Sequence, residues 1–284
     1  MLADCHIHML LDGEYWRAAI DTHRQSPAIA LIRERLASYA QNGFTYLRDG
    51  GDRWGVGRAA RDLAPEYGIR YRTPLAPLCR EGNYGAFIGS TYRDLGEYRT
   101  LVRQIRRDGG DFIKIMISGL MDFDRFGVLT QPGYPRELIR DLIAVAHDEG
   151  FSVMAHANGA RTVEYAAEAG VDSVEHGAYL DSDALRAMAE NGTVWCPTLS
   201  TVGNLRGRGR FDEQAVAAIY DSALANVRCF AAMGGRIAPG SDAGAWAVPH
   251  VEGSLDEYEH LRAALGGDFA ACVTLGVQAI RDKF

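Results

Sequence analysis

Lysine is almost missing from this chain. Of the 30 basic residues only Lys114 and Lys283 are lysines, and all the others are arginines. Acidic residues number 37, so the formal net charge is −7, and no block of like charges stands out. The sequence therefore lacks the basic patch that is typical of nucleic-acid-binding proteins, and we expect no nucleic-acid partner.

Long apolar runs and paired cysteines are absent as well. No stretch of about 18 uncharged apolar residues occurs, and the N-terminus enters a histidine-containing strand pattern without a signal-peptide core, which predicts no membrane partner. The cysteines are an odd number at wide intervals, unlike a disulfide scaffold or a zinc ribbon: Cys5, Cys79, Cys196, Cys229 and Cys272. We expect a cytoplasmic protein, and its 47% hydrophobic residues suffice for one domain over residues 1–284.

What the chain does contain is a repeating pattern of an amphipathic stretch, a glycine and a short β-rich run. The helical period is clear at Leu138, Ile139, Leu142 and Ile143. The junction glycines, which suit the left-handed residue after a helix, are Gly43, Gly68, Gly110, Gly150, Gly170, Gly192 and Gly235. The predicted strands are residues 2–9, 44–49, 69–77, 111–118, 151–157, 171–177, 193–198 and 236–242.

Eight strands alternating with helices predict an α/β protein with a (β/α)₈ TIM-barrel fold. An open doubly wound sheet is the rival. It is disfavoured because no glycine-rich phosphate-binding fingerprint follows the first strand. In a barrel the long connections at 79–93, 119–134 and 199–211 would lie on the C-terminal face, where substrates bind.

Polar side chains of the metal-ligand type lie near the ends of several predicted strands. They are His6 and His8 in the first strand, Lys114 in the fourth, His156 in the fifth, His176 in the sixth and Asp242 in the eighth. His6 and His8 share a face of their strand because side chains alternate. We expect Lys114 to lie deeper than the others. Buried polar groups at one rim are costly unless they are satisfied, and imidazoles with a carboxylate suit zinc or a related divalent ion.

Lys114 is unusual because its neighbours in FIKIMIS are apolar and arginine is the habitual cation of this chain. Burial lowers the pKa of a lysine and makes its neutral amine accessible. A neutral amine captures carbon dioxide as a carbamate, whose two oxygens can bridge two metal ions. We therefore predict a carboxylated Lys114 between two divalent cations.

The ordered segments DCHIHM, IKIMISG, MAHANG, VEHGAYL and PGSDAG resemble the amidohydrolase superfamily, in particular its members with a carboxylated lysine bridging two metals. Residues 113–199 are similar to the Xaa-Pro dipeptidase-like and imidazolonepropionase-like group. The resemblance implies that His6, His8, Lys114 and Asp242 hold one metal ion, and that Lys114, His156 and His176 hold the other. Zinc is the expected metal.

The chain departs from these relatives in two respects. Many of them carry a small β-sandwich, which we do not expect here because His6 lies almost at the start of the sequence. Some place a histidine at the end of the third strand to polarise the substrate carbonyl, whereas TPLAPLCREG contains none. Their substrates therefore do not transfer directly.

The substrate contacts are expected in the connections after the strands. Candidates are Arg80, Tyr84, Arg125, Tyr179 and, in the loop after Asp242, His250. The three arginines of the 199–211 connection, Arg206, Arg208 and Arg210, are either solvated loop cations or carboxylate contacts. Trp16, Phe87, Trp195 and Trp246 are candidates for an apolar substrate wall, with core packing as the default for Trp195.

We expect a metal-dependent hydrolase that cleaves the amide C–N bond of a small molecule, such as an N-acyl amino acid or a dipeptide, by a metal-bridging hydroxide. Asp242 would transfer the proton to the leaving nitrogen. A lactonase, esterase or phosphotriesterase on the same two-metal site, a mononuclear deaminase, and a metal-binding protein without turnover remain alternatives. A homo-oligomer is compatible with the sequence.

Overall fold

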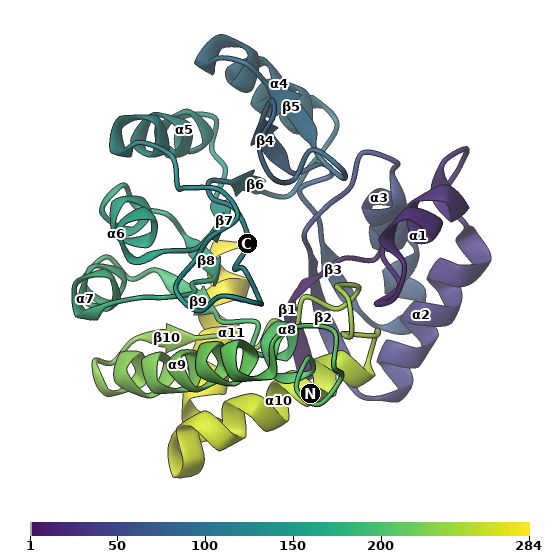
Figure 1. The fold of residues 1–284 in the computed structure, drawn as a ribbon. Helices are drawn as coiled ribbons and strands as arrows, with labels where there is room; N and C mark the ends of the chain where they lie inside the picture. The colour runs from purple at the N-terminus through teal and green to yellow at the C-terminus, as the bar shows by residue number, and fades with distance from the viewer. Residues whose placement is uncertain (1) are drawn as a thin grey trace.

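The computed structural model describes residues 2–284, and strands and helices alternate along them (Figure 1). The strands are β1 (Leu2–Ile7), β2 (Phe44–Asp49), β3 (Arg70–Arg72), β4 (Leu78–Arg80), β5 (Ser90–Tyr92), β6 (Ile113–Met116), β7 (Val153–Ala157), β8 (Ser173–His176), β9 (Val194–Cys196) and β10 (Arg236–Ile237).

Helices follow most of the strands and lie on the outside of the strand layer (Figure 1). They are α1 (Trp16–His23), α2 (Ile29–Gln41), α3 (Val56–Leu63), α4 (Leu95–Arg107), α5 (Arg136–Asp148), α6 (Ala160–Glu168), α7 (Ser182–Glu190), α8 (Ser200–Gly203), α9 (Glu213–Ala232), α10 (Glu252–Leu265) and α11 (Phe269–Lys283), with short 3₁₀ turns η1 (Ala64–Tyr67) and η2 (Gly266–Asp268).

The strands form a TIM-barrel-like arrangement of parallel strands that is not closed by one continuous ladder. β1, β2 and β3 make one sheet, and the other seven strands pair in the order β10-β9-β8-β7-β6-β4-β5. The eight-stranded ladder expected from the sequence is therefore divided in two. The short strands β4 and β5 were not predicted, because they lie inside the connection that follows β3.

The two sheets meet differently on their two sides. Beyond β10, backbone hydrogen bonds join the chain to β1: the Cys5 amide donates to the Pro239 carbonyl at 2.8 Å and the Asp242 amide donates to the His6 carbonyl at 2.7 Å. On the other side the Asp111 amide donates to the Thr73 carbonyl at 2.9 Å, and β4 takes the place beside β6. The carboxyl ends of the strands still point toward one rim.

Each helix buries an apolar stripe against the strands. In α5 this stripe contains Ile139, Leu142 and Ile143, as their spacing predicts. Most junction glycines have positive φ, but at the Gly109-Gly110 and Gly234-Gly235 pairs the first glycine takes the left-handed conformation. The prediction named the second glycine of both pairs and was one residue late there.

The last helix, α11, lies across β9, β10 and β1 (Figure 1). A Cβ added at Gly276 would lie 1.8 Å from the Ile237 carbonyl oxygen, so only glycine permits this close approach. The helical stretch 252–283 is long and apolar enough to cross a membrane by length and composition. Here it is broken at η2, and the buried face of α11 includes Val273 and Ile280.

We expect Gly276→Ala to lower the free energy of unfolding by roughly 1–3 kcal/mol, because the new methyl group must push α11 away from β10. Gly267→Ala is the control, since a Cβ at that position meets no atom within 4 Å. Urea unfolding followed by circular dichroism measures both. Equal midpoints for the two variants would contradict the close packing described here.

Candidate metal centre

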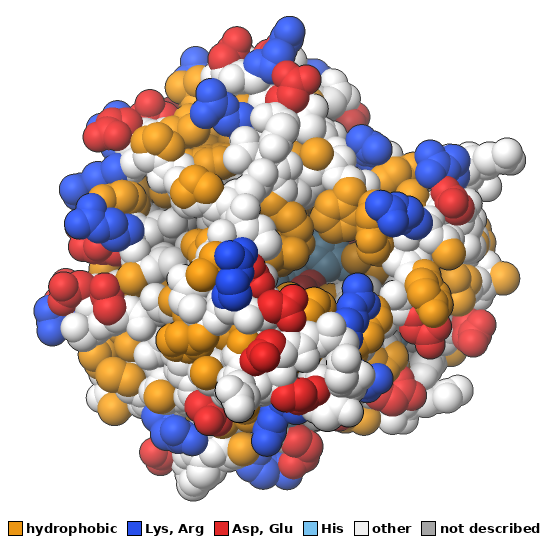
Figure 2. All heavy atoms as spheres, viewed as in Figure 1, with side chains coloured by type: hydrophobic (Ala, Val, Ile, Leu, Met, Phe, Trp, Pro, Cys, Tyr) orange, Lys and Arg blue, Asp and Glu red, His pale blue; other side chains and the backbone are white. Residues whose placement is uncertain are grey.

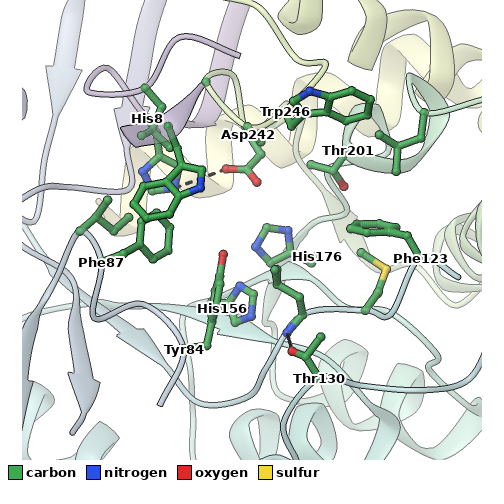
Figure 3. A pocket seen from close by; sticks show the side chains of 18 of the residues that line it. His8, Tyr84, Phe87, Phe123, Thr130, His156, His176, Thr201, Asp242 and Trp246 are labelled. Carbon is green, nitrogen blue, oxygen red and sulfur yellow. Dashed lines mark hydrogen bonds and ion pairs between the residues drawn. The ribbon is translucent and has the colours of Figure 1, made fainter. Parts of the chain in front are cut away.

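Six polar side chains of the ligand type gather at the carboxyl ends of the strands, on the floor of a cavity of about 670 Å³. They are His6, His8, Lys114, His156, His176 and Asp242, the set predicted from the sequence. Figure 2 shows a histidine at the bottom of the hollow, with hydrophobic side chains around its mouth. Figure 3 shows how the side chains converge from different strands and loops.

His6, His8 and Asp242 form the tightest group. Asp242 Oδ1 lies 3.5 Å from His6 Nε2 and 3.4 Å from His8 Nε2, and one potential ligand atom from each residue lies within 4.8 Å of the others (Figure 3). His8 fits because residue 50 is glycine: a Cβ there would lie 2.3 Å from the His8 ring. The three side chains thus offer two imidazole nitrogens and a carboxylate to one ion.

His156 and His176 lie next to this group. Their ring centroids are 4.6 Å apart, and that of His176 is 5.2 Å from that of His6. The Thr198 hydroxyl is 2.8 Å from His176 Nδ1, and the Gly119 carbonyl is 3.1 Å from His156 Nε2. Each ring is therefore fixed through one nitrogen, which leaves the other for a ligand.

Lys114 lies below the histidines, as predicted. In the parallel register it pairs with Met154, two residues before His156 on β7. Its side chain is fully buried, and its Nζ has no hydrogen-bond partner. A buried amine in this state is costly unless it loses its charge or gains a partner.

Two candidate ligands stand in strained backbone. His176 has φ = 69° and Asp242 has φ = 61°, in the left-handed region that residues with a side chain seldom adopt. His176 is the last residue of β8, and Asp242 lies in the loop that follows β10. Such strain persists only where surrounding contacts enforce it, and it is concentrated at functional sites.

Burial shapes the charges of the group. It lowers the pKa of His8 and of His156 to about 3 and that of His6 and His176 well below the usual value, so the imidazoles are neutral at neutral pH. Burial also lowers the pKa of Lys114, although the nearby Glu175 and Asp242 carboxylates act in the opposite direction. Burial raises the pKa of Asp242, although the Lys114 amine acts to lower it.

The donor set fits divalent cations. His6 Nε2, Asp242 Oδ1 and Lys114 Nζ are buried polar atoms without a hydrogen-bond partner, and each needs one in a folded protein. Neutral imidazoles and a carboxylate are ordinary zinc ligands. Of the residues that the structure describes, this floor is where such unsatisfied ligand atoms meet in one group.

Sequence reasoning missed Glu175 and Arg48, which lie beneath the histidines. Both are fully buried, and Arg48 Nη2 donates to Glu175 Oε1 at 2.9 Å. Glu175 Oε2 lies 3.1 Å from His6 Nδ1. A carboxylate at that nitrogen turns the other nitrogen of His6 toward a metal. The sequence signal was a glutamate inside the buried run SVEH, directly before His176.

The predicted substrate contacts divide into two groups. Tyr84 lines the cavity, with its ring centroid 4.8 Å from that of His156, and Trp16, Phe87 and Trp246 line it too. The remaining four candidates do not line it. Arg80 is exposed on β4, and Arg125 pairs with Asp122. Tyr179 packs against Phe126. His250 contacts the Tyr39 hydroxyl and the Leu11 carbonyl. Loop position alone did not reveal which way these side chains point.

Comparisons with known proteins agree with this fold. The model of the amidohydrolase family matches residues 2–206. The chain is 28% identical to an uncharacterized protein of Mycobacterium tuberculosis over 205 residues, 71% of this chain and 52% of the relative, and a Mycobacterium bovis protein matches equally well. This chain thus spans about half the length of those relatives.

Solved structures are similar to this protein across almost the whole chain. A Xaa-Pro dipeptidase with bound methionine in its active site superposes with a TM-score of 0.80 at 23% identity, over 99% of this chain and 75% of that one. The ochratoxinase of A. niger superposes with a TM-score of 0.75 at 22% identity, over 99% of this chain and 69% of that one.

The chain belongs to the amidohydrolase family. The resemblance predicted from its five short segments is confirmed, and so is the TIM-barrel-like fold.

Proposed function

We propose that this protein is a metal-dependent hydrolase that cleaves the amide C–N bond of a small molecule. The main support is the floor of the cavity, where four neutral histidines, a buried amine and a carboxylate that is 14% exposed face one another with several unsatisfied atoms. Family membership supports the reaction class. Xaa-Pro dipeptidase is among the structures with the same fold, and dipeptides and N-acyl amino acids are the first substrates to test.

The residues that would hold two divalent cations are His6, His8 and Asp242 for one ion and His156 and His176 for the other, with Lys114 between them as a carbamate. Bound there, such cations lower the pKa of water and polarise a carbonyl. Zinc is the metal we propose, because the donors are nitrogen and carboxylate oxygen. Thr198, Gly119 and Glu175 keep the rings in position.

Asp242 is the proposed proton carrier. Its carboxylate lines the cavity and lies 3.5 Å from His6 Nε2 and 3.4 Å from His8 Nε2. Burial raises its pKa, which brings the group toward the range in which an acid–base residue works at neutral pH. We propose that it accepts the proton of the attacking water and delivers it to the leaving nitrogen.

The test is a hydrolysis screen with protein supplied with zinc, manganese or cobalt and bicarbonate. It should contain N-acyl amino acids, dipeptides, esters, lactones and phosphotriesters. We expect release of amine from amides, abolished by a chelator and restored by added metal. If only the lactones or only the phosphotriesters are hydrolysed, the proposed amide hydrolysis is wrong and the protein is a lactonase or a phosphotriesterase.

The scarcity of lysine makes the carbamate directly testable. Carbon-13 bicarbonate should give a carbamate resonance in the wild-type protein and in Lys283→Met, and none in Lys114→Met. We also expect Lys114→Met to lower metal content and hydrolysis, because a residue that would hold the cations is lost. A resonance that persists in Lys114→Met would show that another amine reacts.

We further propose that the protein works in the cytoplasm. All five cysteines are free thiols in the structure, and Cys5, Cys79 and Cys196 are buried. Unpaired cysteines suit a reducing compartment.

A further inference from the structure

The cavity has two walls, and one of them carries an arginine. Figure 3 shows His8, Phe87 and Tyr84 on one side and Trp246, Thr201 and Phe123 on the other, with Asp242 between them. The wall of Trp246 also contains Phe211 and Arg210. Apart from Lys114 on the floor, Arg210 is the one basic residue that lines this cavity among the described residues.

Arg210 is held in place without a charged partner. Its guanidinium carbon lies 4.1 Å from the centre of the Trp246 ring and 5.3 Å from that of Phe211. None of the ion pairs or hydrogen bonds found in the described residues uses its side chain. Stacking fixes the plane of a guanidinium and leaves the donors at its edge available.

The loop that carries Arg210 is fixed at several points. The Gly207 and Gly209 amides donate to the Glu213 carboxylate at 2.9 and 3.0 Å, and the Asp212 amide donates to Asp124 Oδ1 at 2.8 Å. Phe211 packs on Phe123 with a ring separation of 5.1 Å. Arg210 is therefore presented at the mouth by a braced loop.

The neighbouring arginines of the same loop have other contacts. Arg206 stacks on Tyr220 at 5.0 Å, and the Arg208 Nε donates to the Asn204 carbonyl at 2.7 Å. Neither lines the cavity. Of the three arginines for which the sequence allowed a carboxylate contact, the structure singles out Arg210.

The acidic residues at the mouth of the cavity do not pair with Arg210. Asp122 pairs with Arg125, and Asp124 accepts the Asp212 amide. Glu14 lies on the stretch just before Trp16, which belongs to the opposite wall. Phe123 and Phe211 line the cavity together with Arg210, so an apolar branch of a ligand that reaches Arg210 can pack on these two rings.

We propose that Arg210 is the specificity-determining residue of the site and binds the free carboxylate of an N-acyl amino acid whose large apolar side chain packs on Phe123 and Phe211. The idea rests on the proposed function, in that the amide bond between the two parts would lie over the cavity floor. The carboxylate and the guanidinium form two parallel hydrogen bonds, which an uncharged amide cannot reproduce. The acyl group then occupies the wall of Phe87 and Tyr84.

Binding tests this inference separately from turnover. Titration calorimetry compares N-acetylphenylalanine with N-acetylphenylalanine amide on wild-type protein, Arg210→Gln and the matched control Arg208→Gln. We expect the carboxylate to bind wild type and the control equally, and to bind Arg210→Gln about 10- to 100-fold more weakly. The amide should bind all three alike. Arg210→Lys, which keeps the charge but loses the fork, should fall between.

Several outcomes overturn the inference. They are equal affinity for the acid and the amide, an equal loss in Arg208→Gln, or no binding of the acid. If binding follows the expected pattern and no amide in the screen is hydrolysed, carboxylate binding by Arg210 is supported and the proposed function fails. If amides are hydrolysed with equal kcat/KM by Arg210→Gln and wild type, the proposed function is supported and the role of Arg210 is refuted. Thermal unfolding confirms that each variant is folded.

Discussion

Asp242→Asn is expected to reduce kcat by about 10²- to 10⁴-fold, the contribution of a well-placed acid–base group. The amide side chain keeps the shape of the carboxylate but cannot carry the proton. We expect the fold to remain, because the Asp242 backbone amide still donates to the His6 carbonyl. Steady-state kinetics with the best amide substrate, together with metal analysis, measures the effect.

The control is Asp183→Asn, which makes the same chemical change on the exposed surface of α7, where the side chain is 69% exposed. It should leave kcat unchanged. The assignment of Asp242 is refuted by full activity in Asp242→Asn. A variant without activity that has also lost its metal would assign Asp242 to metal binding alone.

Arg48→Met is expected to destabilise the protein by about 3–5 kcal/mol, because it leaves the buried Glu175 carboxylate without its cation. Arg48 also donates to the Cys5 carbonyl at 2.6 Å and to the Ser173 hydroxyl at 2.9 Å, so several polar atoms lose their partner together. Chemical unfolding of wild type and variant gives the difference. Arg93→Met removes the exposed pair with Glu97 and should cost at most about 1 kcal/mol.

A double-mutant cycle separates the pair from its surroundings. Glu175→Gln alone should also destabilise, and Arg48→Met with Glu175→Gln should cost less than the sum of the single changes. Additive losses would mean that the two side chains do not depend on each other. Glu175→Gln also removes the carboxylate next to His6, so its metal content is a second measurement.

The fold was predictable where the chain repeats its signals. Most of the strands are predicted by apolar runs, such as the one around Ile113, and by the junction glycines that precede them. Parallel strands buried on both faces appear in the sequence as such nearly continuous apolar runs. The break between β3 and β6 was not predictable. It depends on how β4 and β5 pair within a connection, and short strands of three residues carry no periodicity of their own.

The floor of the site was predictable because its residues are rare in such surroundings. Lys114 between isoleucines and His6 two residues before His8 are conspicuous in the sequence alone. The walls were less accessible. Arg80 and Arg210 both lie in connections that follow predicted strands, and only the packing on Phe211 and Trp246 shows that Arg210 lines the cavity whereas Arg80 does not.

The division of the strands into two sheets has a mechanical consequence. His6 belongs to the three-stranded sheet and His8 directly follows its strand β1, whereas Lys114, His156 and His176 belong to the seven-stranded sheet. Metal ions bound by these residues would link the two sheets. Without the ions, we expect one sheet to move more freely relative to the other on the side of β3 and β6. Amide hydrogen exchange should then quicken first in β3 and β6, with the helices farther out unaffected.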